Sequence, residues 1–289
     1  MISLTQSVRV RGTAGEPIPT VWQALENAGI IFRRGQLVLI AAGPGTGKSV
    51  VALALSLESA VPSFMFSADS DSFTQLSRAI ANLCGIPLSM AQDIVLSKTI
   101  PADTEAELNS IPLRIDYSAS PSTDDIRNEI MAYWEVYGEY PSLVIVDNLT
   151  NVVSDMTEAG DPFSGLEGLM DFLHGMARET SACVVALHHV TGDYNNADRA
   201  IPLNGVKGQI TRVPEMVLTI HRKPGYIEDH WILCVSPVKN RGGRPDPTGQ
   251  TYAELHFVGG MMSISDLAPE IAEQIDIGEW ERAQHEHLI

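Results

Sequence analysis

A glycine-rich segment, residues 42–49, combines residue types that bind phosphate. It follows an apolar run, residues 37–41, and precedes a helix-forming run, residues 50–55. Glycines let backbone N–H groups turn toward phosphate oxygens, a lysine reaches the β- and γ-phosphates, and a serine hydroxyl can bind Mg²⁺. A plain glycine turn before a helix is the alternative, and the strand–loop–helix context argues against it. The predicted nucleotide-binding residues are Gly43, Pro44, Gly45, Thr46, Gly47, Lys48, Ser49 and Val50.

An aspartate closes a second apolar run. Residues 143–146 read Leu-Val-Ile-Val and Asp147 follows directly. In a nucleotide-binding sheet such an acid binds Mg²⁺ together with the serine of the phosphate loop, here Ser49. An aspartate can also end any strand without a further role, but the phosphate loop upstream favours the metal-binding interpretation. Ser49 and Asp147 are therefore the predicted metal ligands.

Two further strand ends carry polar side chains suited to hydrolysis. Asp69 follows the run Phe66-Ser67-Ala68 and is the first choice for orienting or deprotonating water, with Asp71 second. Either aspartate could instead cap the helix that follows. His189 ends the apolar run 182–187 and could sense the γ-phosphate, although an ordinary loop histidine is a serious alternative.

A basic segment near the C-terminal end of the chain could serve a neighbouring subunit. It reads Val238-Lys239-Asn240-Arg241-Gly242-Gly243-Arg244 and follows a strand-like run, 231–235, that we expect to end at Ser236-Pro237. An arginine finger neutralises charge in the transition state and raises the rate by about 10³-fold or more. A basic residue of this segment could act in that way. A solvent-exposed basic hairpin is the alternative.

Alternating strand and helix patterns surround these residues and predict an α/β fold. The expected fold is a mostly parallel, twisted sheet with helices on both faces and an antiparallel extension near its C-terminal end. In this topology strand 63–68, which Asp69 follows, should lie next to strand 36–41. The expected strands are 36–41, 63–68, 113–117, 143–147, 182–187, 216–221, 231–235 and 251–256. The expected helices are 20–29, 48–58, 71–84, two within 87–111, 122–137 and 163–180.

Composition limits the function classes. The 289 residues carry a net charge of −17, which argues against nonspecific nucleic-acid binding. Residues 199–244 nevertheless hold eight of the 19 basic residues against three acids. This local charge is equally consistent with a nucleic-acid site and with an ordinary solvated surface. No apolar run is long enough to cross a membrane, and residues 1–19 lack an apolar signal core. The three cysteines are expected to be buried free thiols in a reducing compartment.

Taken together, four segments resemble the RecA-type ATPase domain of DnaB-like replicative helicases, over about residues 29–267. Residues 34–49 are similar to the family's G-x-L-x-x-I-A-x-x-P-G-x-G-K-[ST], and Phe66-Ser67-Ala68-Asp69 to F-S-L-E. Residues 112–116 and 122–127 look like P-L-x-I-D and S-x-x-x-I-R. Residues 239–243 with Pro247-Thr248-Gly249 resemble K-x-R-x-G-P-T-G. Asp69 replaces a glutamate, His189 replaces a glutamine, and residues 244–246 are inserted.

The resemblance implies an ATP- and Mg²⁺-dependent DNA helicase motor. It implies a homohexamer in which Lys239 and Arg241 act on the next subunit's ATP, and single-stranded DNA held by the loops after Asp147 and His189. The first loop, 150–162, is acidic, whereas the second, 191–208, offers Arg199 and Lys207 as the predicted DNA contacts. With only about 30 residues upstream of the core, no collar domain is expected. Such minimal chains resemble phage or plasmid helicases, working with replication proteins in the bacterial cytoplasm.

The expected organisation is an N-terminal arm with a short linker helix (1–29), a RecA-like core (30–263) and an acidic helical tail (264–289). Two other functions stay open. A recombinase of the RecA or RadA type would form filaments on DNA, and the finger motif argues against it. A KaiC-like regulatory ATPase or a helicase-loading partner would act by protein contact, and the acidic tail is consistent with that.

Overall fold

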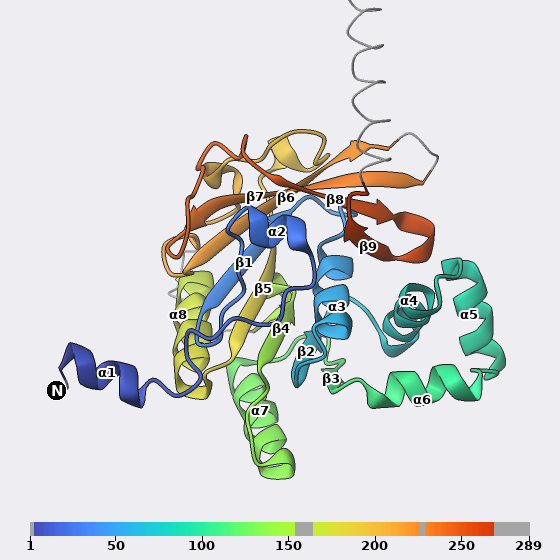
Figure 1. Ribbon diagram of the computed structural model, residues 1–289, viewed down its shortest axis with the longest axis horizontal. Coiled ribbons are helices and arrows are strands. Elements are labelled where there is room, and N and C mark those ends of the chain that lie inside the picture. Colours follow the sequence, from blue (N-terminus) through green and yellow to red (C-terminus); the bar gives the residue numbers. More distant parts are fainter. Residues whose placement is uncertain (1–2, 154–163, 226–228, 269–289) are drawn as a thin grey trace, which may run out of the picture.

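A computed structural model of the chain describes residues 3–153, 164–225 and 229–268. These residues form one nine-stranded sheet in the order β3-β2-β4-β5-β1-β6-β7-β8-β9 (Figure 1). The strands are β1 (Leu37–Ala42), β2 (Ser63–Ser67), β3 (Leu113–Asp116), β4 (Leu143–Asp147), β5 (Cys183–His189), β6 (Met216–Pro224), β7 (His230–Asn240), β8 (Ala253–Val258) and β9 (Ser263–Asp266). The predicted α/β class with a mostly parallel sheet is confirmed.

In the part of the chain that the structure describes, two helices precede β1, and six more lie in the connections between the parallel strands. They are α1 (Leu4–Val10), α2 (Gln23–Asn27), α3 (Lys48–Glu58), α4 (Ser72–Cys84), α5 (Leu88–Ser97), α6 (Ala102–Ser110), α7 (Thr123–Tyr137) and α8 (Ser164–Thr180). The predicted bounds of α3 are confirmed, and Ser122 caps α7 as its sequence indicated. Helix α7 ends where Gly138 adopts a left-handed conformation, which a residue without a side chain tolerates best. The short helix α1 was not predicted.

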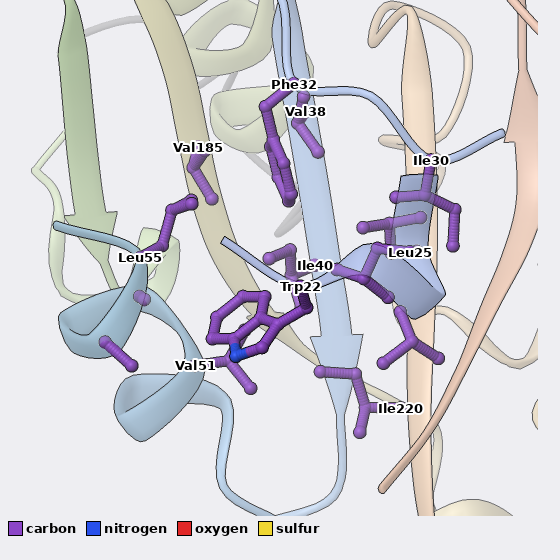
Figure 2. Packing of buried hydrophobic residues seen from close by; sticks show 14 of the residues in the cluster. Trp22, Leu25, Ile30, Phe32, Val38, Ile40, Val51, Leu55, Val185 and Ile220 are labelled. Atoms are coloured by element: carbon purple, nitrogen blue, oxygen red, sulfur yellow. The ribbon is translucent and has the colours of Figure 1, made fainter. Parts of the chain in front are cut away.

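Strand β1 lies at the centre of two hydrophobic cores because its alternate side chains point to opposite faces of the sheet. Val38 and Ile40 pack with Trp22 and with α3, as Figure 2 shows for Val51 and Leu55. Leu37 and Leu39 pack on the other face, against apolar residues of α7 and α8. All six residues of β1 are buried. The strand that leads into the phosphate loop is therefore held rigidly from both sides.

Parallel pairing brings the carboxyl ends of six strands, β1 to β6, to one edge of the sheet. Strand β1 pairs with β5 and β6, and the register sets Ala42 opposite His189. Strand β2 pairs with β3 and β4, and Ser67 lies opposite Asp147. The expectation that β2 adjoins β1 was wrong, because β4 and β5 lie between them. Sheet order depends on long-range pairing, which the local periodicity of the sequence does not record.

The antiparallel extension is longer than predicted. Strand β7 does not end at Ser236-Pro237 but continues to Asn240, and a register shift at Val217/Leu218 of β6 accommodates the proline, which has no N–H to donate.

The expected tail helix, 264–289, was wrong at its start, since Ile264 and Asp266 belong to β9. Both carboxylate oxygens of Asp266 cap α2 through the N–H groups of Gln23 and Ala24, at 2.8 Å each. Residues 269–289 lie outside the described part.

Within the described residues, no helix has the length and apolar character that crossing a membrane requires. None of the three cysteines, all within the described residues, forms a disulfide bond. Cys183 and Cys234 are buried as expected, and burial raises the pKa of Cys183 to about 12. Cys84 is exposed, which corrects the expectation of burial, because it lies in the last turn of the surface helix α4.

Candidate active site

The phosphate loop connects β1 to α3. Gly47 precedes α3 with φ of 116°, a left-handed value that L side chains rarely adopt. The hydroxyl of Thr46 donates to the carbonyl of Gly43 at 2.8 Å, which tightens the turn. The ammonium group of Lys48 is buried and donates to the carbonyls of Ala42 and Gly43 at 3.1 and 3.0 Å. A phosphate oxygen could take the place of these carbonyl oxygens as the acceptor of the lysine's hydrogen bonds.

Asp147 lies beside this lysine at the end of β4. Its side chain is 1% exposed and accepts a hydrogen bond from Ser49. Among the described residues, its Oδ2 atom has no hydrogen-bond partner although it is buried. Burial raises the pKa of Asp147, and it lowers the pKa of Lys48 against the attraction of Asp147 and Asp69. A buried carboxylate oxygen with spare capacity next to a serine hydroxyl fits a divalent cation.

The described residues hold no cluster of three or more His, Cys, Asp or Glu side chains that could enclose a metal ion. Mg²⁺ keeps several waters and uses one or two protein oxygens together with substrate phosphates. Ser49 and Asp147 are such a pair. The donor set therefore fits a cation that arrives with a nucleotide.

Asp69, which follows β2, and His189, the last residue of β5, meet at a third residue, Asn148. The amide nitrogen of Asn148 donates to Oδ2 of Asp69 and lies 3.5 Å from Nε2 of His189. Burial and the nearby Lys48 lower the pKa of His189, so its ring is neutral near pH 7. Asp71 has a different place: it caps α4, accepting from the N–H of Thr74 at 2.8 Å. The structure thus brings Asp69, and not Asp71, into this group.

A cavity of about 370 Å³ opens beside the phosphate loop and contains two arginines that sequence analysis missed. Arg78 of α4 lines it, and the attraction of Asp147 opposes the lowering of the Arg78 pKa by burial. Arg222 of β6 donates to the carbonyl of Gly45 at 3.2 Å and stacks over Trp231, with 4.2 Å from its guanidinium carbon to the ring centroid. Neither arginine lies in a recognisable motif. The only sequence signal for them is that each is a basic residue in a helix or strand close to the phosphate loop.

Lys239 and Arg241 lie elsewhere, and within the described residues neither lines this cavity. Asn240 between them pairs with Met216, which in turn pairs with Val38, four residues before the end of β1. At a rise of about 3.3 Å per residue, that level is about 13 Å from the phosphate-loop end of the strand. The ammonium group of Lys239 donates to the carbonyls of Thr211 and Arg212 at 2.7 and 2.6 Å. Lys239 and Arg241 therefore lie toward the opposite end of the strands from the phosphate loop of the same chain.

The segment 191–208 carries both predicted DNA contacts on its surface. Arg199 and Lys207 are exposed, and Arg199 stacks over Tyr194 at 5.0 Å. The same segment touches the phosphate loop, because the carbonyl of Asn195 packs directly against Gly43. The ring nitrogen Nε2 of His188 lies 3.0 Å from the carbonyl of Lys207 and ties the segment to β5. Of the other predicted loop, 150–162, residues 154–162 lie outside the described part.

Comparisons with known proteins agree with this geometry. Residues 17–263 match the model of the DnaB-like helicase C terminal domain. The chain is 54% identical to "Gene 65 protein" of Mycobacterium phage L5, over 92% of this chain and 99% of that protein. It is 26% identical to "Replicative DNA helicase DnaB" of Leifsonia xyli, over 87% of this chain but 56% of that protein. A solved DnaB-like replicative helicase superposes with a TM-score of 0.74 at 18% identity, covering 92% of this chain and 67% of that one. The chain therefore belongs to the family of DnaB-like helicase C-terminal domains.

Proposed function

We propose that the chain hydrolyses ATP in a Mg²⁺-dependent reaction and uses the energy to move along single-stranded DNA. One observation carries the proposal: Lys48, Ser49 and Asp147 converge beside an open cavity, and Oδ2 of Asp147 is buried without a hydrogen-bond partner among the described residues. Membership of a helicase domain family supports ATP hydrolysis over simple nucleotide binding.

The roles follow from the chemistry of each group. Backbone N–H groups of residues 43 and 45–50 and the ammonium group of Lys48 would hold the phosphates. Ser49 and Asp147 would hold Mg²⁺, which when bound offsets the negative charge that builds up on the phosphate oxygens. Asp69 would orient the attacking water, and His189 would report whether the γ-phosphate is present. Arg78 would add positive charge on the same side as Asp147.

The second half of the site would come from a neighbouring copy of the chain. Lys239 and Arg241 lie about 13 Å along the sheet from their own phosphate loop, so they cannot serve it without unfolding the sheet. A ring of identical subunits puts such a surface against the next subunit's nucleotide, because each contact in a ring is head to tail. A homohexamer with shared sites is the assembly that we propose.

Arg199 and Lys207 would contact DNA phosphates, since both are exposed on a segment that touches the phosphate loop at Gly43. The similarity to a phage protein suggests replication in a bacterial host cell as the setting, with other replication proteins as partners. The recombinase and regulatory ATPase alternatives lack such support. We also propose the division into an arm (1–29), an ATPase core that begins at residue 30 and includes β9, and a tail that follows β9.

A mixing experiment tests the shared site. Lys48→Ala and Arg241→Ala should each abolish most ATP turnover as pure proteins. Mixed one to one and reassembled, about a quarter of the interfaces would join an intact Lys48 to an intact Arg241, and turnover should reappear. Arg241→Ala alone should still bind ATP. No recovery on mixing, or normal turnover by Arg241→Ala alone, would refute the assignment in trans. Lack of stimulation by single-stranded DNA would favour the regulatory ATPase.

A further inference from the structure

Asn148 links the two polar strand ends of the active site. It follows Asp147 at the end of β4 and is 2% exposed. Its Nδ2 atom donates to Oδ2 of Asp69 and lies 3.5 Å from Nε2 of His189. Its Oδ1 atom accepts from the backbone N–H of Thr150 at 2.9 Å and from the hydroxyl of the same residue. Every polar atom of this buried amide therefore has a partner.

The partners fix which way the amide points. A backbone N–H can only donate, so the end of Asn148 that faces the N–H of Thr150 must be the oxygen. The nitrogen end then faces Asp69 and His189, and its two hydrogens suffice for one bond to each. Because that nitrogen is a donor, Nε2 of His189 must accept, and the proton of the neutral ring is on Nδ1.

We propose that Asn148 is a positioning residue, which holds the carboxylate of Asp69 at the distance that water activation needs and fixes the tautomer of His189. This rests on the proposed function, in which Asp69 orients the attacking water. Asp69 is exposed and follows the end of β2, which is separated from β1 by two strands. An exposed aspartate with two freely rotating bonds would spend much of its time in other rotamers. A buried, fully bonded amide beside it restricts that freedom.

Kinetics separate positioning from folding. Asn148→Asp keeps the oxygen that Thr150 needs but replaces the donor toward Asp69 with a second carboxylate. We expect kcat for ATP to fall about 10- to 100-fold in both Asn148→Asp and Asn148→Ala, while KM changes less than about threefold. Asn128→Ala, at an exposed position of α7, is the matched control and should keep wild-type kcat. Wild-type kcat in Asn148→Asp would overturn the proposal.

A double-mutant cycle tests whether Asn148 acts through Asp69. If it does, adding Asn148→Ala to Asp69→Asn should lower kcat by less than about twofold, since the group to be positioned is already disabled. Multiplicative losses would show independent roles and contradict the proposal.

The tautomer gives a readout that does not depend on turnover. Nitrogen-15 spectra of histidine-labelled protein, with His189→Gln to assign the signal, should show the proton of His189 on Nδ1 in the wild type. In Asn148→Ala that preference should weaken or reverse. A proton on Nε2 in the wild type would overturn the proposal. A wild-type protein that hydrolyses no ATP would instead refute the proposed function, and the spectra would still decide the geometry.

Discussion

The carboxylate of Glu215 accepts a hydrogen bond from the backbone N–H of Leu37, at 3.0 Å from Oε2. The two residues also pair through their backbones, with the N–H of Glu215 donating to the carbonyl of Leu37 at 3.0 Å. Oε1 of the same carboxylate lies 2.9 Å from Nε2 of His174 and 3.9 Å from a guanidinium nitrogen of Arg241. Glu215 thus contacts both Leu37, the first residue of β1, and Arg241, the proposed arginine finger.

Removing this carboxylate should destabilise the fold. Glu215→Leu leaves the buried N–H of Leu37 without its side-chain acceptor, and we expect the free energy of unfolding to fall by about 2–3 kcal/mol. Glu215→Gln keeps an acceptor oxygen and should lose about 1 kcal/mol. Urea denaturation at pH 7 measures both. Equal losses in the two variants would mean that the negative charge, and not the hydrogen bond, provides the stabilisation.

A methyl group at Gly43 should push the segment 191–208 off the phosphate loop. An added Cβ would lie 2.2 Å from the carbonyl oxygen of Asn195, which is backbone and cannot swing aside. We expect Gly43→Ala to speed amide hydrogen exchange in residues 192–199 by about tenfold or more. Gly45→Ala is the matched control: nothing lies within 4 Å of its added Cβ, so strain from its φ of 70° should stay local. Unchanged exchange in Gly43→Ala would contradict the direct contact.

Replacing Arg222 should weaken nucleotide binding, since it links the carbonyl of Gly45 to the face of Trp231 at the cavity. We expect the Kd for ATP to rise about tenfold in Arg222→Ala, and almost as much in Arg222→Lys, because lysine lacks the planar group that stacks. Calorimetric titration measures both. The matched control is Arg127→Ala, which removes a similar stack over Phe172 away from the cavity and should leave Kd unchanged. A normal Kd in Arg222→Ala would exclude a role in binding.

Local signals predicted the elements that carry the phosphate loop. Helix α3 keeps its predicted bounds because glycine conformations and helix-forming residues act over a few positions. The order of the strands was not predictable in the same way, and the assumed contact between β2 and β1 was wrong. Pro237 suggested a strand end, but β7 continues past it, with Val238 as an extra residue where the register against β6 shifts.

The residues of the candidate site that belong to sequence motifs could be predicted. The residues that reach the site only through tertiary packing could not. Asp147 ends β4, and Lys48 and Ser49 begin α3 after the loop that follows β1. Parallel pairing brings the ends of β1 and β4 to the same edge of the sheet. Arg78, Asn148 and Arg222 have no motif, and their contacts depend on which strands are neighbours. Ile264 fits an apolar helix pattern, yet it packs in the sheet core as part of β9.

Acid should destabilise the protein partly through His188. This ring is 0% exposed, and burial lowers its pKa to about 4, against about 6.5 in an unfolded chain. Between these two values the unfolded state binds the proton and the folded state does not. Stability is therefore unaffected above pH 6.5 and is lost as the pH falls toward 4, by up to about 1.4 kcal/mol per pH unit.

His188→Gln isolates this contribution. The amide nitrogen of glutamine can take the place of Nε2 and donate to the carbonyl of Lys207, but it cannot titrate. Between pH 7 and pH 5 the variant should lose about 1–2 kcal/mol less unfolding free energy than the wild type, measured by urea denaturation at both values. Some acid sensitivity should stay, because burial also lowers the pKa of His221 to about 4. Equal losses in variant and wild type would show that His188 is already protonated, or solvated, in the folded protein.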